Sequence, residues 1–267
     1  MKVSSLHIYP VKGLKGIELD AANATERGLE HDRRWMVVDN DGVFLTQRDY
    51  PKMATVWTDI GPDGLELSAP DVGEVTVPLK PEGTKPMRVQ VWNSVVEALP
   101  ASAKADVWLT KYLGLGCRLV YMPDTTRRTS NEEYAGEGKL VGFADGYAYL
   151  VITEASLEDL NKRLAAKKHP PLPMNRFRPN IVVSGAQPYA EDHWDEVKVG
   201  GAVLRGVKPC GRCQVTTTDQ STGEVRGPEP LQTLASYRDS TRFGQMFGMN
   251  LVTVKTGRIA VGDAVTP

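Results

Sequence analysis

Short runs of hydrophobic and polar positions alternate through the first hundred residues, and none of these runs keeps a helical period. The runs are rich in β-branched and aromatic residues, and turn signals such as Asp41-Gly42 separate them. This pattern predicts β-strands joined by tight turns, with a hairpin at residues 40–42. Together the strands favour a small β-barrel or sandwich. They are expected at residues 3–11, 33–39, 43–47, 54–60, 65–69, 74–79 and 87–92.

The hydrophobic period becomes helical at residues 102–114 and again at residues 153–167. In the second helix three leucines recur on one face, and Thr153 or Ser156 can cap its start. A shorter helix is expected at residues 228–238, with a proline near its start. The remaining strands are expected at residues 117–122, 147–152, 177–185, 194–207, 213–219 and 249–267.

These elements predict a mainly β protein with some helix, of the α+β class. The clearest change in composition lies near residues 98–120. We therefore expect a small N-terminal β-barrel or sandwich at residues 1–100 and a second β-rich domain with a few short helices at residues 101–267. Residues 123–146 are polar and rich in glycine, which is typical of a functional loop or of a partly mobile one.

Composition narrows the class of protein further. The 267 residues are 41% hydrophobic and 24% charged, with a formal net charge of −1, so nothing indicates a nucleic-acid partner. No run of about 18 apolar residues is present, and we expect no membrane span. The first residues lack the apolar stretch of a signal peptide, and the three cysteines do not suggest a disulfide framework. The expected compartment is the cytoplasm.

Cys210 and Cys213 form a C-x-x-C pair that has several interpretations. A thioredoxin-like redox pair would need a helix after it, whereas the sequence that follows is of β type. A zinc site would need four ligands, and no second C-x-x-C or suitably spaced histidine pair is present. Two buried structural thiols form a third interpretation. In the fourth, Arg212 favours the thiolate of Cys213, which binds a soft metal whose other ligands come from a cofactor.

Cationic side chains that could hold such a cofactor occur at several points in the sequence. Lys12 lies in a glycine-rich bend, and Arg33 and Arg34 lie at the start of an expected strand. Arginine can bind a phosphate group through two parallel hydrogen bonds. Asp145 lies in a glycine-flanked bend before another strand, where a plain turn is an equally good explanation.

A second arginine pair, Arg176 and Arg178, directly precedes an apolar stretch and is followed by Asn180. Because side chains alternate along an extended segment, we expect both arginines to point to the same side and Phe177 to the other. Each arginine taken alone could equally be an ordinary surface residue.

The residues that carry this chemistry resemble those of the MOSC domain. The resemblance rests on the segments FADGYAYLVITEASLEDLNKRL, NRFRPNIVVSGAQPYAEDHWDEVKVG and VKPCGRCQVTTTDQSTGE. The segment IYPVKGLKGIELDAANATERGLEHDRRWMVVD resembles the β-barrel that precedes this domain in the same family. The similarity runs over residues 3–265 and is to the mitochondrial amidoxime-reducing components and to bacterial reductases of N-hydroxylated compounds.

The resemblance implies a molybdenum cofactor, in which one molybdopterin and one protein cysteine hold the metal. In the family this ligand is the second cysteine of the pair, which is Cys213 here. It also implies that residues 1–100 form the N-terminal barrel domain and residues 101–267 the MOSC domain. The family's contacts to the pterin and its phosphate fall on Lys12, Arg33, Asp145, Arg178, Asn180 and Arg212.

The chain also departs from the family pattern. Gly13 stands where mitochondrial relatives have a serine, and Met246 stands where a tyrosine is expected, which puts one wall of the pocket in doubt. We expect neither the membrane anchor of the mitochondrial members nor the ferredoxin domain of some bacterial ones. Because no cysteine set for an iron–sulfur cluster is present, the electrons must come from a separate reductase: a flavoprotein, a ferredoxin or a b-type cytochrome.

The function that the resemblance implies is a molybdenum-dependent oxidoreductase. Its substrates would be small N-hydroxylated compounds such as amidoximes, hydroxylamines and N-hydroxylated bases, which it reduces to amines by removing the oxygen atom at molybdenum. The alternative is a carrier of the molybdenum cofactor, or a sulfur-transfer module, that binds the cofactor without turnover. A metal-free thiol redox protein is a third possibility.

Overall fold

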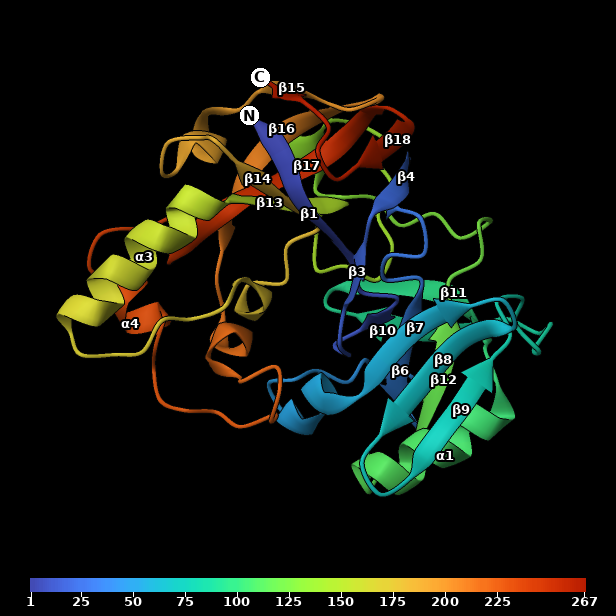
Figure 1. Ribbon diagram of the computed structural model, residues 1–267. Coiled ribbons are helices and arrows are strands. Elements are labelled where there is room, and N and C mark those ends of the chain that lie inside the picture. Colours follow the sequence, from blue (N-terminus) through green and yellow to red (C-terminus); the bar gives the residue numbers. More distant parts are fainter.

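The computed structural model describes all 267 residues and consists mainly of β-strands with four short α-helices (Figure 1). This confirms the α+β class that the sequence predicts. None of the helices has both the length and the apolar character needed to traverse a bilayer. The helices are α1 (Ala103–Leu113), α2 (Glu132–Ala135), α3 (Glu154–Ala166) and α4 (Leu231–Ala235).

The largest sheet has eight strands in the order β19-β15-β16-β17-β13-β14-β1-β3. Its first strand in the chain, β1, pairs antiparallel with β14, which comes from the second half of the sequence. Strands β13 and β14 are parallel, and helix α3 lies in the connection between them. The strands are β1 (Lys2–Ile8), β3 (Ile17–Leu19), β13 (Tyr149–Thr153), β14 (Ile181–Ser184), β15 (Glu196–Val199), β16 (Ala202–Gly211), β17 (Met246–Lys255) and β19 (Val265–Thr266).

Three smaller sheets complete the fold, in the orders β10-β11-β12-β6-β2, β18-β4-β5 and β7-β8-β9. Strand β12 lies beyond residue 100 and pairs with β6, while β1 belongs to the large sheet, so strands from both sides of residue 100 mix in two of the sheets. The strands are β2 (Val11–Lys12), β4 (Ala21–Thr25), β5 (Gly28–Leu29), β6 (Trp35–Asp39), β7 (Trp57–Gly61), β8 (Gly64–Ala69), β9 (Gly73–Val77), β10 (Met87–Val91), β11 (Ser94–Pro100), β12 (Cys117–Tyr121) and β18 (Gly257–Ala260).

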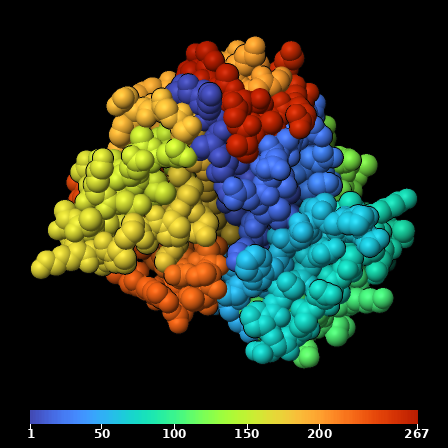
Figure 2. Space-filling model, in the orientation of Figure 1, coloured from blue at the N-terminus to red at the C-terminus, as the bar shows by residue number.

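The two ends of the chain lie side by side, because Lys2 and Ala264 form a β-bridge (Figure 1). In the space-filling view the N-terminal segment, in dark blue, separates the yellow region from the cyan one (Figure 2). The N-terminal segment therefore contacts two parts of the molecule: β1 pairs with β14, and β2 pairs with β6.

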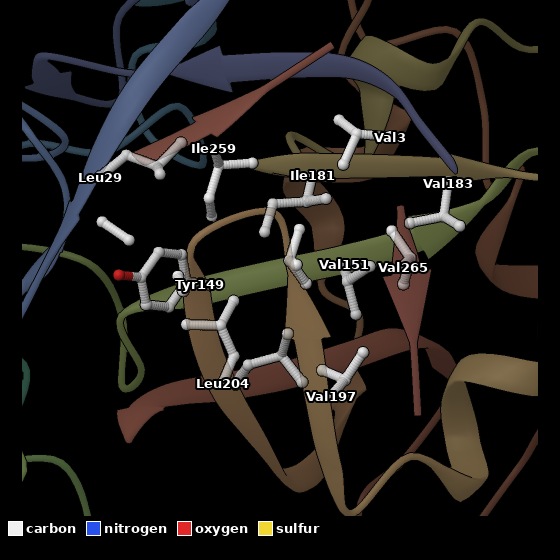
Figure 3. Close-up of a cluster of buried hydrophobic side chains, with 14 of the residues drawn as sticks. Val3, Leu29, Tyr149, Val151, Ile181, Val183, Val197, Leu204, Ile259 and Val265 are labelled. Carbon is white, nitrogen blue, oxygen red and sulfur yellow. The ribbon is translucent and has the colours of Figure 1, made fainter. Parts of the chain in front are cut away.

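The fold has two main hydrophobic cores. The first holds 19 buried residues, and in it Leu29 and Ile259 from the sheet β18-β4-β5 pack with Val151 and Ile181 from the large sheet (Figure 3). The second holds 17 buried residues, and it includes Leu109 of α1 as well as residues of β8 and β9. Burial of each large aliphatic side chain stabilises the fold by about 1.5–3 kcal/mol.

The two long helices begin and end as the sequence predicts. Helix α1 ends at Gly114, whose φ of 79° is a left-handed conformation that glycine adopts without strain. Helix α3 is capped by Thr153, whose hydroxyl accepts a hydrogen bond from the backbone N–H of Ser156. The hairpin at residues 40–42 is also present, since Gly42 donates to the carbonyl of Asp39 at 3.1 Å.

Several of the expected strands are shorter than predicted, and three differ most. Residues 43–47 contribute only isolated bridges at Val43 and Phe44, and the strand expected from residue 177 begins at Ile181. The strand expected at residues 213–219 is instead a 3₁₀ helix over Gln214–Thr217. Its threonine hydroxyls donate to backbone carbonyls three residues earlier, and such local bonds compete with strand pairing.

Candidate functional site

A cavity of about 940 Å³, including its open mouth, lies where the two halves of the chain meet. One wall comes from Lys12, Gly13 and residues 44–48 together with Asp145, which pairs with Lys12, and another wall from Arg178 and residues 210–213. All seven residues that the sequence singled out for a cofactor line this cavity: Lys12, Arg33, Asp145, Arg178, Asn180, Arg212 and Cys213.

Lys12 at the end of β2 is 8% exposed and forms an ion pair with Asp145. The indole N–H of Trp92 donates to the same carboxylate at 3.0 Å. Burial lowers the pKa of Lys12, and Asp145 opposes that effect. Enclosure by the cavity walls acts to raise the pKa of Asp145, but Lys12 and Trp92 outweigh it and hold the pKa below its usual range. Asp145 is therefore charged at neutral pH, and its carboxylate favours the protonated form of Lys12.

Arg33 is held by a buried carboxylate behind the cavity wall. Its guanidinium donates to both oxygens of Asp32, at 2.9 and 2.8 Å, and to the side-chain oxygen of Asn180 at 3.1 Å. Asn180 also donates to the backbone carbonyl of His7 and accepts from the N–H of Leu150. Asn180 lines the cavity, but its polar atoms already have protein partners, so it supports the position of Arg33.

Tyr9, which the sequence analysis missed, lies between two of the cavity arginines. The guanidinium carbons of Arg33 and Arg178 are each 4.2 Å from the centre of its ring. Both arginines have left-handed backbones, with φ of 46° and 54°, a conformation that costs about 1–3 kcal/mol per residue. Such strain is common at binding sites. An aromatic residue three positions before Lys12 was the only available sequence signal.

Arg176 and Arg34 do not reach the cavity. Arg176 ends a 3₁₀ helix, donates to the carbonyl of Thr217 at 2.9 Å and forms an ion pair with Asp219 at 3.2 Å. The expected alternation of Arg176 with Arg178 is therefore wrong, because the segment is not extended there. Arg34 is directed elsewhere, with its guanidinium 2.7 Å from the carboxylate of Asp124.

Cys210 and Cys213 both line the cavity and are half-buried. The guanidinium of Arg212 donates to the sulfur of Cys210 at 2.9 Å and to the carbonyl of Phe177 at 2.7 Å. The sequence analysis had Arg212 acting on the thiolate of Cys213, whereas its contact is with Cys210. The Nε of Arg212 is buried without a hydrogen-bond partner.

The cavity lining contains five cationic side chains and a single carboxylate, that of Asp145. The cations are Lys12, Arg33, Arg48, Arg178 and Arg212. This excess of positive charge suits an anionic ligand, and the unpaired N–H at Nε of Arg212 is available to donate a hydrogen bond to that ligand. No group of three His, Cys, Asp or Glu side chains comes together in the fold, so a metal at Cys213 would depend on ligands from a cofactor. The donor set therefore fits a phosphorylated cofactor that supplies its own metal ligands.

The rim of the cavity contains an aromatic cluster that sequence reasoning did not identify. The ring centres of Phe44 and Trp92 are 4.8 Å apart, and the guanidinium of Arg48 lies 4.4 Å from the Trp92 ring. Trp92 occupies the turn between β10 and β11 with a φ of 54°. A bulky aromatic residue in a hairpin turn, where small polar residues are usual, was the available signal.

The loop at residues 123–146 is anchored and forms part of the cavity wall. The buried guanidinium of Arg128 donates to the carbonyls of Gly142 and Ala144, both at 2.6 Å, and to that of Asp145 at 3.0 Å. A β-bridge joins Thr129 to Leu140. Arg128 thus fixes the bend that presents Asp145 to Lys12.

The fold and this cavity define a two-part protein of the MOSC class. Residues 1–115 match the MOSC N-terminal beta barrel domain, and residues 139–266 match the MOSC domain. The matched regions contain all seven cavity residues predicted from the sequence.

The chain belongs to the family of MOSC proteins that includes the mitochondrial amidoxime-reducing components. It is 34% identical over 279 residues to mitochondrial amidoxime-reducing component 1 of Mus musculus, covering 98% of this chain and 81% of that protein. Component 2 of Bos taurus and component 1 of Homo sapiens are each 34% identical as well, with 98% of this chain and 82% of each protein covered.

Proposed function

We propose that this protein binds a molybdenum cofactor in the cavity and reduces small N-hydroxylated compounds to amines. The observation that carries the proposal is the assembly of Cys213 with Lys12, Arg33, Arg178 and Arg212 around one cavity. These residues come from distant parts of the sequence, and the fold brings them together. The names of the relatives, amidoxime-reducing components, supply the reaction class.

Different residues of the cavity would hold different parts of the cofactor. Cys213 would supply the protein thiolate, while Arg178 and Arg212 would bind the anionic groups of the pterin and its phosphate. Lys12 and Arg33 would add positive charge from the opposite wall, each held in place by its carboxylate partner. When bound, the cofactor supplies two-electron redox chemistry at molybdenum.

The overall reaction consumes two electrons and two protons. The N–O bond of the substrate breaks, the nitrogen is left as the amine, and the oxygen leaves as water. This chain has no cysteine set for an iron–sulfur cluster, so we infer that a separate reductase delivers the electrons. The protein itself binds, orients and encloses the reactants.

The rim of the cavity favours flat substrates. Phe44 and Trp92 give it aromatic surface, and Arg48 adds a cation that can pair with a polar edge of the substrate. We therefore expect aryl amidoximes and N-hydroxylated bases to be better substrates than small aliphatic amidoximes.

The test is to purify the protein from a host with an intact molybdenum cofactor pathway and to measure its molybdenum content. The same sample is then assayed for reduction of benzamidoxime with a chemically reduced viologen as electron donor. We expect molybdenum to be present in stoichiometric amounts and amine to form. A molybdenum-loaded protein that forms no amine from any N-hydroxylated substrate would refute the reductase and favour the carrier.

A further inference from the structure

A pair of buried glutamines lies at the cavity, with Gln47 in its lining and Gln220 bonded to it from behind. Gln47 belongs to the segment between β6 and β7, and Gln220 follows the 3₁₀ helix after Cys213. Gln47 is 2% exposed and Gln220 is 4% exposed. Their side-chain amides bond reciprocally: Gln47 donates to Gln220 at 3.2 Å, and Gln220 donates to Gln47 at 2.9 Å.

Each glutamine also contacts a residue that lines the cavity. Gln47 donates to the carbonyl of Gly13 at 2.7 Å, directly after Lys12. The amide oxygen of Gln220 accepts a hydrogen bond from the guanidinium of Arg178 at 3.2 Å. All four polar atoms of the pair therefore have partners, and a buried network without unpaired groups specifies a single arrangement.

The partner of Arg178 differs in charge from the partners of the neighbouring cations. Lys12 is paired with the carboxylate of Asp145, and Arg33 with that of Asp32. Arg178 instead meets a neutral amide and has no carboxylate within ion-pair distance. Burial lowers the pKa of Arg178 to about 10, so it stays protonated at neutral pH. Its positive charge is thus oriented by the protein but not cancelled.

We propose that Gln47 and Gln220 form a charge-neutral clamp, which joins the two walls of the cavity and orients Arg178 while leaving its charge for an anionic group of the ligand. Both glutamines are positioning residues, because they act through Arg178 and Gly13. The clamp rests on the proposed cofactor site. It explains why an amide rather than a carboxylate occupies position 220.

The test compares two substitutions of the same residue. Gln220→Glu keeps an acceptor for Arg178 but adds a negative charge, whereas Gln220→Met removes the acceptor and adds none. Inorganic phosphate is titrated into the cofactor-free full chain by calorimetry, and thermal unfolding is recorded for each variant. We expect Gln220→Glu to weaken phosphate binding about tenfold or more and Gln220→Met only about two- to threefold.

The order of these losses decides between a neutral clamp and a merely structural contact. A structural role would make the loss of binding follow the loss of thermal stability, with Gln220→Met at least as damaging as Gln220→Glu, and this result would overturn the proposal. If Gln220→Glu does not fold, Gln47→Glu and Gln47→Met provide the same comparison one residue further from Arg178. The glutamate should again be the more damaging.

A second measurement separates the clamp from the proposed function. Molybdenum content is measured for wild type and for each variant after expression in the cofactor-producing host. Wild type that binds phosphate but never carries molybdenum would refute the proposed function. The phosphate titrations of the variants would still test whether the glutamine pair orients Arg178. Wild type that does not bind phosphate at all would overturn the clamp, because Arg178 would then have no anion to hold.

Discussion

The cationic side chains on the two walls of the cavity have different kinds of partner. On one wall Lys12 and Arg33 are each bonded to a carboxylate, Asp145 and Asp32. On the other wall Arg178 is bonded to the amide of Gln220, and Arg212 to the sulfur of Cys210 and a backbone carbonyl. Apart from Arg48, which lies over the Trp92 ring, the cations of the first wall are balanced by carboxylates, whereas Arg178 and Arg212 on the second wall carry charge that only a ligand can balance.

This difference assigns separate tasks to residues that look alike in the sequence. A cation that is paired with a buried carboxylate contributes to the stability of the fold, and its removal leaves a buried charge without a partner. A buried cation without a carboxylate costs stability in the absence of ligand and contributes to ligand binding. We therefore expect the neutral wall to stabilise the cavity and the charged wall to bind an anion.

The largest expected effect concerns the two cysteines of the charged wall. Cys213→Ser should abolish reductase activity, because serine does not supply the thiolate that a soft metal prefers. Cys210→Ser should retain most of the activity, because a serine hydroxyl can still accept the hydrogen bond from Arg212. Activity with a reduced viologen as donor is the measurement. Equal losses in the two variants would instead favour a dithiol mechanism.

The next comparison exchanges one arginine on each wall for glutamine. Arg33→Gln leaves the buried carboxylate of Asp32 without its cation and should cost about 3–5 kcal/mol of unfolding free energy. Arg178→Gln removes a buried cation that has no carboxylate partner, so its cost should be below about 1 kcal/mol.

Phosphate binding should show the opposite order, with Arg178→Gln causing the greater loss once both variants are measured well below their unfolding temperatures. Urea denaturation and calorimetry provide the two measurements. If Arg178→Gln were the less stable variant, the division of the walls would be wrong.

The seven residues that the sequence singled out come from distant segments and line one cavity, and their contacts to a cofactor stay a prediction. The partners could be predicted only in part: Asp32 directly precedes Arg33 and Tyr9 lies three residues before Lys12, whereas Gln220 is brought to Arg178 only by the fold. The sequence predicts an effect of Arg212 on the adjacent Cys213, and in the structure its guanidinium contacts the sulfur of Cys210.

The fold was predicted where local signals were strong. Helices α1 and α3 have a clear hydrophobic period and recognisable caps, and both form as expected. The stretch after Cys213 has the composition of a strand, but the hydroxyls of Thr216 and Thr217 bond locally and produce a 3₁₀ helix. The pairing of β1 with β14 leaves no local signal in the sequence at all.

A smaller effect is expected from the ion pair on the neutral wall. The carboxylate of Asp145 is about two-thirds exposed, with 67% of its side-chain surface accessible, so its contribution to stability is modest. Because its folded pKa lies below the usual 3.8, the contribution is present above pH 3.8 and is lost as the pH falls through the folded pKa.

Denaturation of wild type and Asp145→Asn over a range of pH checks this expectation. The advantage of wild type over the variant should be constant near neutral pH and should shrink below about pH 4. An advantage that is independent of pH would show that Asp145 acts through the shape of its bend, not through its charge.

The smallest effect is expected at the rim, where Trp92 combines an aromatic surface with a hydrogen bond to Asp145. Trp92→Phe keeps the ring and loses only the N–H donor to Asp145, a bond worth about 1 kcal/mol, so KM should rise by at most about fivefold and equally for benzamidoxime and acetamidoxime, with kcat unchanged. Trp92→Ala should raise KM for benzamidoxime further, while KM for acetamidoxime should stay at its value in Trp92→Phe. Equal changes for the two substrates in Trp92→Ala would mean that Trp92 acts only by holding Asp145 and the neutral wall. Unequal changes would make the rim a third region, which selects the substrate after the two walls have bound the cofactor.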